Sequence, residues 1–382
     1  MDFEIGPHTI LLTVAGSRAY GIHRPDSDVD VKGVAIPPRR YFLGFAQKFE
    51  QCDDSGRLAF ALPLLNDVER AASADTKLEG AIYELRKFMA LAAENNPNIL
   101  DALFCRDEEV RLVTPLGEKL RAHRDMFLSA RAKHTYSGYA TAQLKRIKGH
   151  RKWLLEPPKS RPTRAEFGLP EHTLIPSDQL AAAAAKVQKR IDGWELDFTG
   201  MQPATGVELQ ARIAEELAEI RSAAGLGTVE ELKWLAAARL VGLDENLVNV
   251  MQRERDYEAA ARHYRQYEDW RKLRNVVRSA LEADHGYDTK HAAHLVRLLR
   301  MGREILETGQ VHVWRGDIDA DELRAIRAGA WEYERLVEWA EAEDRALQAI
   351  YESRAFVVPK APDRGALDSL CVELVEAFLT AR

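Results

Sequence analysis

The spacing of apolar and polar positions changes near residue 115. Before this point, short apolar runs alternate with turns, and the pattern predicts strands at 9–14, 28–36 and 78–83. The first run is continuously apolar and rich in β-branched residues. The second alternates, with Val29 and Val31 on one face and Asp28 and Asp30 on the other. An amphipathic helix is predicted over 85–95, and a short helix should follow it through residue 103.

Beyond residue 115 the pattern is almost entirely helical. Helices are predicted at roughly 133–155, 178–195, 207–224, 229–239, 244–283, 289–308, 331–352 and 366–380. Five of the fifteen prolines lie within 156–176, which indicates a long loop or linker. The sequence therefore predicts an α+β fold with a first domain at 1–125. A mostly helical domain at 126–382 should contain the proline-rich loop or linker at 156–177.

Composition restricts the class of protein. The 382 residues are 46% hydrophobic, and 54 Lys and Arg face 60 Asp and Glu, for a net charge of −6. This balance argues against a surface that grips nucleic acid or an anionic membrane over its whole extent. No apolar run approaches the roughly 20 residues of a membrane span, and the first residues do not have the layout of a signal peptide. Three widely spaced cysteines suit a reducing compartment, so we expect a soluble cytoplasmic protein with no membrane partner.

The paired aspartates in the second predicted strand suggest a metal site. Asp28 and Asp30 are two residues apart on a strand, so both carboxylates should lie on one face, where like charges repel. A divalent cation removes this conflict, and Mg²⁺ (or Mn²⁺) prefers carboxylate, water and phosphate oxygens as ligands. A lone Asp-x-Asp is more often a solvated strand face.

A second element suited to phosphate lies ten residues upstream. Gly16 and Ser17 end the first predicted strand, and the residues after them can form a short helix. Glycine allows close approach of the backbone, the serine hydroxyl can donate, and helix N-terminal amides favour anions. A lone Gly-Ser is usually only a turn. In this order and spacing, however, the two elements supply what two-metal-ion nucleotidyl transfer requires.

Gly16-Ser17 followed by Asp28-Val29-Asp30 resembles the signature of the DNA polymerase beta-like nucleotidyltransferase superfamily. The longer string GSRAYGIHRPDSDVDVKGVAIPP resembles one branch, the predicted nucleotidyltransferases associated with RNA ligases. Later segments that resemble the same branch are 83–88, 96–101, 138–146 and 290–302. The first motif is specific for the superfamily, whereas the later ones indicate the branch and not a reaction.

The resemblance implies a small mixed sheet, a bound nucleoside triphosphate and a triad of acidic metal ligands. Asp28 and Asp30 would be two of the ligands, and the third acid is expected on a later strand. Glu79 is the first candidate, and Glu84 and then Asp75 are the alternatives. The residues expected to bind the nucleotide are Gly16, Ser17, Arg18, Tyr20, Lys290 and Arg297.

The helix predicted at 289–308 carries several cations and histidines. The resemblance favours Lys290 and Arg297 near the triphosphate, and the alternative is a solvated basic face with one packed histidine. A metal site built on His291 and His294 is not expected, because the sequence implies no third ligand.

A basic strip lies at 145–164. It contains the cations Lys145, Arg146, Lys148, Arg151, Lys152, Lys159, Arg161 and Arg164, with Glu156 as the single acid. The strip is a candidate path for RNA, through phosphate contacts and stacking on nearby aromatic residues. A solvated helix face beside a loop is the alternative.

We therefore expect an enzyme that moves a nucleoside monophosphate from a nucleoside triphosphate to an acceptor hydroxyl and releases pyrophosphate. RNA modification or repair at an RNA end is the first expectation for the acceptor. The alternatives are transfer to a protein or small molecule, and a nucleotide-binding protein without catalysis.

Overall fold

The computed structural model describes residues 3–24, 27–73, 78–173, 177–192, 245–273 and 276–381. The chain forms two compact units, Met1–Glu156 with Asn275–Arg382, and Pro157–Arg274. The second unit is thus an insertion in the sequence of the first. These units are defined by spatial contacts, so the domain boundary expected after residue 125 stays a prediction.

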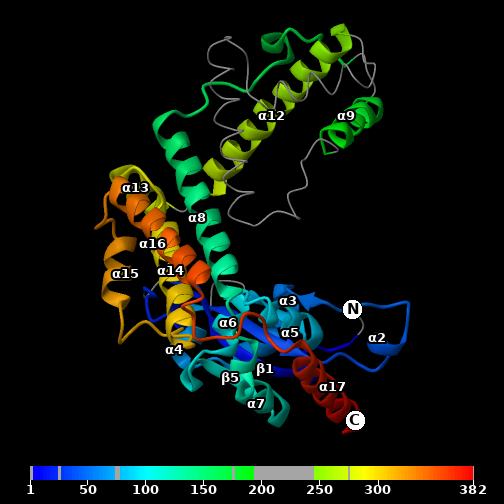
Figure 1. Cartoon of the computed structure of the whole chain (residues 1–382), viewed down its shortest axis with the longest axis vertical. Coiled ribbons are helices and arrows are strands. Elements are labelled where there is room, and N and C mark those ends of the chain that lie inside the picture. Colours follow the sequence, from blue (N-terminus) through cyan, green and yellow to red (C-terminus); the bar gives the residue numbers. More distant parts are fainter. Residues whose placement is uncertain are drawn as a thin grey trace. The chain divides into compact units, whose positions relative to one another are not determined.

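A mixed five-stranded sheet forms the centre of the first unit (Figure 1). Its strands are β1 (Thr9–Ala15), β2 (Asp30–Ala35), β3 (Gln51–Cys52), β4 (Glu79–Glu84) and β5 (Val110–Val113), in the spatial order β3-β4-β2-β1-β5. β2 runs antiparallel to β1 and parallel to β4. The expected α+β fold with a small mixed sheet is confirmed. The hydrophobic pattern did not predict β3 and β5, which contain only two and four residues.

Both faces of the sheet are covered, which explains the continuous apolar run in β1, where every residue is buried. One face packs Leu12, Val31 and Ile82 against the segment that contains Tyr41 and Leu58. The opposite face belongs to the larger core that the helices share. Because side chains alternate along a strand, Asp30 and Lys32 of β2 lie on the face opposite Val31, which is the helical side of the sheet.

Short helices surround the sheet. They are α1 (Gly16–Ala19), α2 (Arg40–Leu43), α3 (Ser55–Leu58), α4 (Asp67–Ala72), α5 (Leu85–Ala93), α6 (Pro97–Leu103) and α7 (Pro115–Ala122). The side chain of Glu84 caps α5 by accepting from the Lys87 backbone N–H. Asn96 caps α6, whose first residue is Pro97. The helices expected at 85–95 and up to residue 103 are therefore confirmed.

The rest of the first unit is helical. It contains α8 (Ala132–Leu155), α13 (Val276–His285), α14 (Thr289–Thr308), α15 (Ala320–Arg327), α16 (Tyr333–Ser353) and α17 (Arg364–Thr380). α8 and α14 lie side by side (Figure 1). At Gly302 a Cβ atom would lie 2.9 Å from Cβ of Tyr136, so only glycine allows this close contact between the helices.

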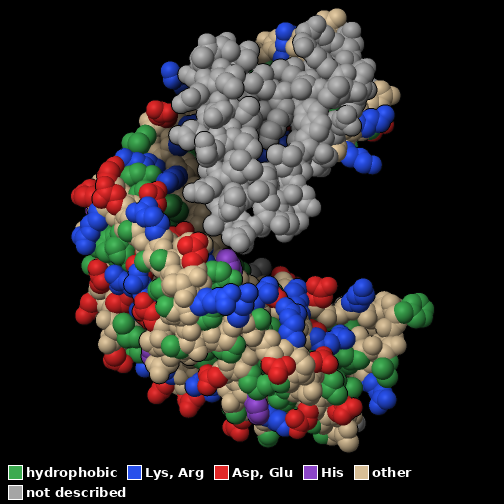
Figure 2. Space-filling view, viewed as in Figure 1, with side chains coloured by type: hydrophobic (Ala, Val, Ile, Leu, Met, Phe, Trp, Pro, Cys, Tyr) green, Lys and Arg blue, Asp and Glu red, His purple; other side chains and the backbone are tan. Residues whose placement is uncertain are grey.

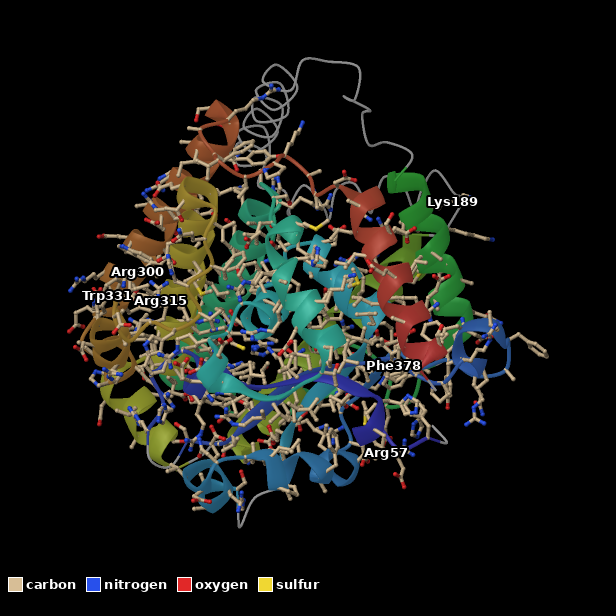
Figure 3. All side chains as sticks on the ribbon, turned by 90° about the horizontal axis from the view of Figure 1, so that it is seen from below. Arg57, Lys189, Arg300, Arg315, Trp331 and Phe378 are labelled. Atoms are coloured by element: carbon tan, nitrogen blue, oxygen red, sulfur yellow. The ribbon has the colours of Figure 1, made fainter. Side chains whose placement is uncertain are left out.

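Ion pairs join α14 to α15 and to the loop before it (Figure 3). The buried guanidinium of Arg315 donates to Glu304 over 2.8 Å and to Asp319 over 2.7 Å. Arg300 donates to the second oxygen of Asp319, also over 2.7 Å. This paired network fixes one wall of the cavity described below.

The second unit contains α9 (Ser177–Asp192) and α12 (Glu245–Leu273) among its described residues. The helix expected at 244–283 is described as α12, which ends at Leu273, and α13, which begins at Val276 in the other unit; residues 274 and 275 lie outside the described residues. The helices expected at 207–224 and 229–239 lie outside the described residues. None of the described helices combines the length and the apolar character needed to cross a membrane.

Candidate nucleotide and metal site

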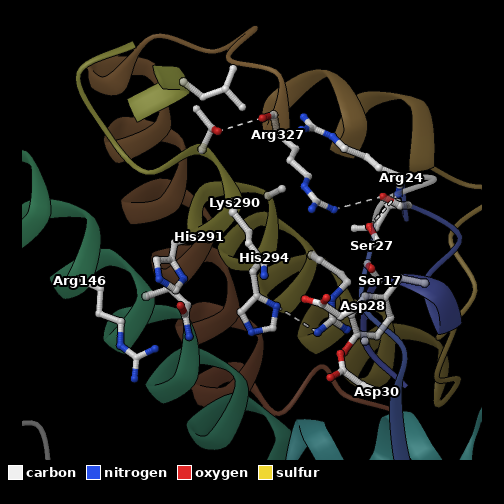
Figure 4. A pocket seen from close by; sticks show the side chains of 18 residues that line it. Ser17, Arg24, Ser27, Asp28, Asp30, Arg146, Lys290, His291, His294 and Arg327 are labelled. Carbon is white, nitrogen blue, oxygen red and sulfur yellow. Dashed lines mark hydrogen bonds between the residues drawn. The ribbon is translucent and has the colours of Figure 1, made fainter. Parts of the chain in front are cut away.

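A cavity of about 570 Å³ opens at the edge of the sheet where β1 ends and β2 begins (Figure 4). Its lining comes from the β1–β2 connection, from α8 and from α14 and its neighbours. The lining residues are Gly16, Ser17, Tyr20, Ile22, Arg24, Ser27, Asp28, Asp30, Gln143, Arg146, Leu281, Thr289, Lys290, His291, Ala293, His294, Arg297 and Arg327. The structure therefore brings seven of the nine predicted site residues to one cavity.

Gly16 is fixed as glycine by its backbone and by its neighbour. Its φ angle is +65°, in the left-handed region that most side chains avoid. A Cβ atom at this position would lie 2.5 Å from Oδ2 of Asp30. The glycine thus lets the backbone that follows β1 approach the Asp30 carboxylate, next to Ser17.

The predicted acids meet at the start of two neighbouring strands. In the parallel pair of β2 and β4, Asp30 lies beside Glu79, and register partners in such a pair face the same side of the sheet. Asp28 precedes β2 and is exposed. Burial raises the pKa of the Asp30 carboxyl, and the Glu79 carboxylate raises it further, whereas Lys32 and Lys290 lower it. Like charges therefore meet at Asp30.

The two alternative acids are not at this place. Glu84 lies at the other end of β4, five residues from Glu79, roughly 16 Å along the strand. Its carboxylate is buried, caps α5 and accepts from Nε of Arg86 over 2.9 Å. The structure gives Glu84 a structural role, and Asp75 lies outside the described residues. Glu79 is thus the described candidate that lies beside Asp30.

Arg18 supports the connection that carries Asp28. Its guanidinium is buried, and it donates to the backbone oxygens of Ser27 over 2.8 Å and of Asp28 over 3.3 Å. The cation therefore orients the segment that carries Asp28 through its backbone. A direct contact of Arg18 with a nucleotide stays a prediction.

The β1–β2 connection and β4 lie within a segment that is similar to a known protein family. Residues 4–154 match the RNA repair pathway DNA polymerase beta family. This segment is therefore similar to that family. An uncharacterized 38.9 kDa protein of the nrdC–mobD intergenic region of Enterobacteria phage T4 is 28% identical over 149 residues. The alignment covers 37% of this chain and 40% of the phage protein, so the chain matches less than half the length of this relative. No solved structure matches the chain significantly.

The family segment meets α14 in a buried polar cluster. Arg297 is 1% exposed and donates to Oδ1 of Asp101 over 3.3 Å. The hydroxyl of Tyr20 donates to Oδ2 of the same carboxylate over 2.6 Å. The guanidinium carbon of Arg297 lies 3.7 Å from the centre of the Tyr20 ring. Tyr20 and Arg297 line the cavity, and the partners of both side chains described here lie within the protein.

Lys290 and His294 of α14 also line the cavity. Lys290 is exposed and lies near enough to Asp30 to lower the pKa of its carboxyl. Burial lowers the pKa of His294 well below its usual value, and the positive charge of Arg297 contributes, so this imidazole is neutral at pH 7. Lys290 is therefore the cation of α14 best exposed to meet a triphosphate (Figure 4).

The basic strip is partly neutralised. Lys148 pairs with Glu341, Arg151 pairs with Glu334 and donates to the Gly286 backbone oxygen, and in the second unit Arg164 pairs with Glu254. Lys and Arg side chains alternate with Asp and Glu over the face of the first unit seen in Figure 2. Arg146 is exposed and lines the cavity, which makes it the member of the strip best placed for a ligand there.

Sequence reasoning did not single out Asp101, Arg24, Ser27 or Arg327. Arg327 donates to the Ile22 backbone oxygen over 3.4 Å, and Ser27 accepts from the Arg24 backbone N–H over 2.8 Å. Arg24 and Ser27 lie between Gly16-Ser17 and Asp28-Val29-Asp30, so their place in the sequence was the signal that could have identified them. Nothing in the sequence connects Arg327 with the motif, because a contact across about 300 residues leaves no local pattern.

Proposed function

We propose that the protein is a metal-dependent nucleotidyltransferase that moves a nucleoside monophosphate from a nucleoside triphosphate to the hydroxyl of an RNA end. The observation that carries this proposal is the meeting of Gly16-Ser17, Asp28, Asp30 and Glu79 at the cavity end of β1, β2 and β4. The match of residues 4–154 to a family of RNA repair pathways supports the choice of RNA.

The donor set fits a hard divalent cation. Asp28, Asp30 and Glu79 offer carboxylate oxygens, and the raised pKa of Asp30 reflects burial and the neighbouring Glu79 charge. Mg²⁺ or Mn²⁺ held there would neutralise the triphosphate and the developing charge of the attacking oxygen.

The other residues of the site bind and orient the substrate. Ser17 and the backbone at Gly16 hold the β- and γ-phosphates, and the Lys290 ammonium offsets their charge from the opposite wall. The acceptor oxygen forms a bond to the α-phosphorus, the bridging α–β P–O bond breaks, and pyrophosphate leaves with the electron pair. Glu79 accepts the proton of the acceptor hydroxyl.

The test offers each α-labelled nucleoside triphosphate with Mg²⁺ or Mn²⁺ to the whole protein. Defined RNAs with 3′-hydroxyl or 3′-phosphate ends serve as acceptors, and the label is read in RNA, protein and small-molecule fractions. Wild-type protein should label RNA with a 3′-hydroxyl. Asp28→Asn and Asp30→Asn should lose at least about 100-fold of this activity, because each removes a metal ligand.

Asp67→Asn is the matched control. This carboxylate belongs to the same unit and is 99% exposed, so its loss should leave labelling unchanged. Label in protein or a small molecule would overturn the RNA acceptor but keep nucleotidyl transfer. Wild-type protein that binds no nucleoside triphosphate in the presence of metal would overturn the whole proposal.

A further inference from the structure

A second group of potential ligands lies on the α8–α14 side of the cavity, apart from the carboxylates of β2 and β4. His150 is near the end of α8, Asp288 precedes α14, and His291 is in the first turn of α14. One ligand atom from each lies within 4.8 Å of the others. The sequence did not indicate this group, because His150 is separated from the other two by more than 130 residues.

The carboxylate of Asp288 is directed between the two imidazoles. Oδ1 accepts from the His291 backbone N–H over 3.1 Å and so caps α14. Oδ2 lies 3.4 Å from Nδ1 of His150 and 3.5 Å from Nε2 of His291. Oδ1 of Asp288 thus caps α14, and Oδ2 faces both imidazole rings.

These distances are compatible with three ligands that share an ion. Direct N–H···O hydrogen bonds have heavy-atom distances of about 2.7–3.2 Å, which is shorter than both spacings. Four ligands at about 2.0–2.1 Å from a tetrahedral zinc ion are about 3.3–3.4 Å apart. The two spacings to Asp288, 3.4 and 3.5 Å, are close to this second value, and all three ligand atoms lie within 4.8 Å of one another. We propose that His150, Asp288 and His291 form a Zn²⁺-binding site.

Burial and packing support a specific site. The Asp288 side chain is fully buried, and those of His150 and His291 are only 17% and 18% exposed. The His150 ring stacks on Trp153 with ring centres 5.6 Å apart. Arg151 donates to the Gly286 backbone oxygen over 3.1 Å, which fixes the end of α8 against the segment before Asp288. The ligands are thus held by contacts that do not depend on the ion.

Two histidines and one carboxylate suit zinc better than magnesium, which prefers oxygen ligands. Three protein ligands leave one of four positions for water or a solute, and His291 also lines the cavity. Zinc at this place would join α8 to the first turn of α14. It would thereby fix the backbone of Lys290, which lies between two of the ligands.

The experiment measures zinc binding by the full chain after removal of metal with a chelator. A chromophoric chelator competes for Zn²⁺ in millimolar Mg²⁺, and Co²⁺ substitution gives a second readout through its visible spectrum. Wild-type protein should bind one Zn²⁺ per chain. The Asp28→Asn/Asp30→Asn double variant should bind it equally well, which separates this site from the proposed catalytic one.

His150→Asn, Asp288→Asn and His291→Asn should each weaken zinc binding by about 100-fold or more, since even indirect partners of a ligand account for 10–100-fold. Asp288→Asn keeps a good helix cap, so the fold should persist, and thermal unfolding in chelator checks this for each variant. His294→Gln, one turn further along the same helix, is the matched control and should keep wild-type affinity.

The proposal is overturned if wild-type protein binds no stoichiometric Zn²⁺, or if the folded His150 and Asp288 variants bind it as tightly as wild type. Loss of zinc in His294→Gln, with retention in His150→Asn, would also overturn it and assign the ion to the His291–His294 pair. These outcomes do not depend on nucleotidyl transfer, because no step of the assay uses a nucleotide.

Discussion

The guanidinium carbon of Arg297 lies 3.7 Å from the centre of the Tyr20 ring, and both side chains bind the Asp101 carboxylate. A charged group from α14 is thus stacked on an aromatic ring from the motif segment, some 280 residues earlier in the chain. Cation–π contact and a shared carboxylate compensate the burial of both charges. This cluster couples the stability of the fold to the wall of the cavity.

Asp101→Asn should lower the free energy of unfolding by about 3–5 kcal/mol, because it leaves the buried Arg297 charge without its counter-ion. Chemical denaturation at equilibrium measures the change. Combining it with Arg297→Met should give a smaller loss than the sum of the two single variants, with a coupling of about 1–3 kcal/mol. Additive losses would contradict the pairing of these side chains.

Gly16→Ala should abolish metal-dependent binding of nucleoside triphosphate. The backbone at this position is left-handed, which a residue with a Cβ atom disfavours, and the new Cβ atom would lie 2.5 Å from the Asp30 carboxylate, so one of the two must move. Gly138→Ala is the control: it lies in α8 with no atom within 4 Å of the added Cβ, and should raise stability by about 1 kcal/mol. Equal nucleotide binding by both variants would contradict the role of Gly16.

Arg18→Met should lower kcat by about 10- to 100-fold with a smaller effect on KM, if transfer occurs as proposed. The side chain holds the Ser27 and Asp28 backbone, and small displacements of catalytic groups have effects of this size. Steady-state kinetics on labelled nucleotide gives both constants. Arg39→Met, at an exposed arginine, is the control. A change confined to KM would instead indicate that Arg18 contacts the nucleotide.

Arg146→Gln should weaken RNA binding. It should also reduce the slope of log K against log salt concentration by about 1, which corresponds to the loss of one phosphate contact. Arg146 lines the cavity, whereas the equally charged Lys145 is exposed but is not among the cavity-lining residues. Titrations at several salt concentrations compare Arg146→Gln with Lys145→Gln. An equal effect of the two substitutions would indicate diffuse attraction, and no effect of either would remove this part of the strip from the RNA path.

The spacing of apolar and polar residues predicted many of the helices and strands, because this spacing depends only on residues that are close in the sequence. The apolar run at 9–14, the alternation around Asp30 and the helical spacing at 289–308 each reflect a single element, and β1, β2 and α14 appear where expected. The helix expected at 244–283 includes the boundary between the two units after residue 274, and no change in helical periodicity marks that boundary.

The site depends on contacts between distant parts of the chain, which a single sequence does not contain. The motif indicated Asp28 and Asp30, but only the parallel register of β2 and β4 places Glu79 beside Asp30. Likewise, Arg297 was expected near a triphosphate, while its buried partnership with Asp101 required the packing of α6 and α14. His150 gave no sequence signal at all.

The division of the cavity between the start and the end of the chain has a consequence for biosynthesis. The acids of the motif leave the ribosome about 270 residues before Arg297, and at typical rates the delay is roughly 15–50 s. During this interval Tyr20 and Asp101 have no guanidinium to enclose, and the carboxylates have no opposing Lys290. A nascent chain therefore carries the motif long before it can form the cavity, so translation itself postpones any chemistry there.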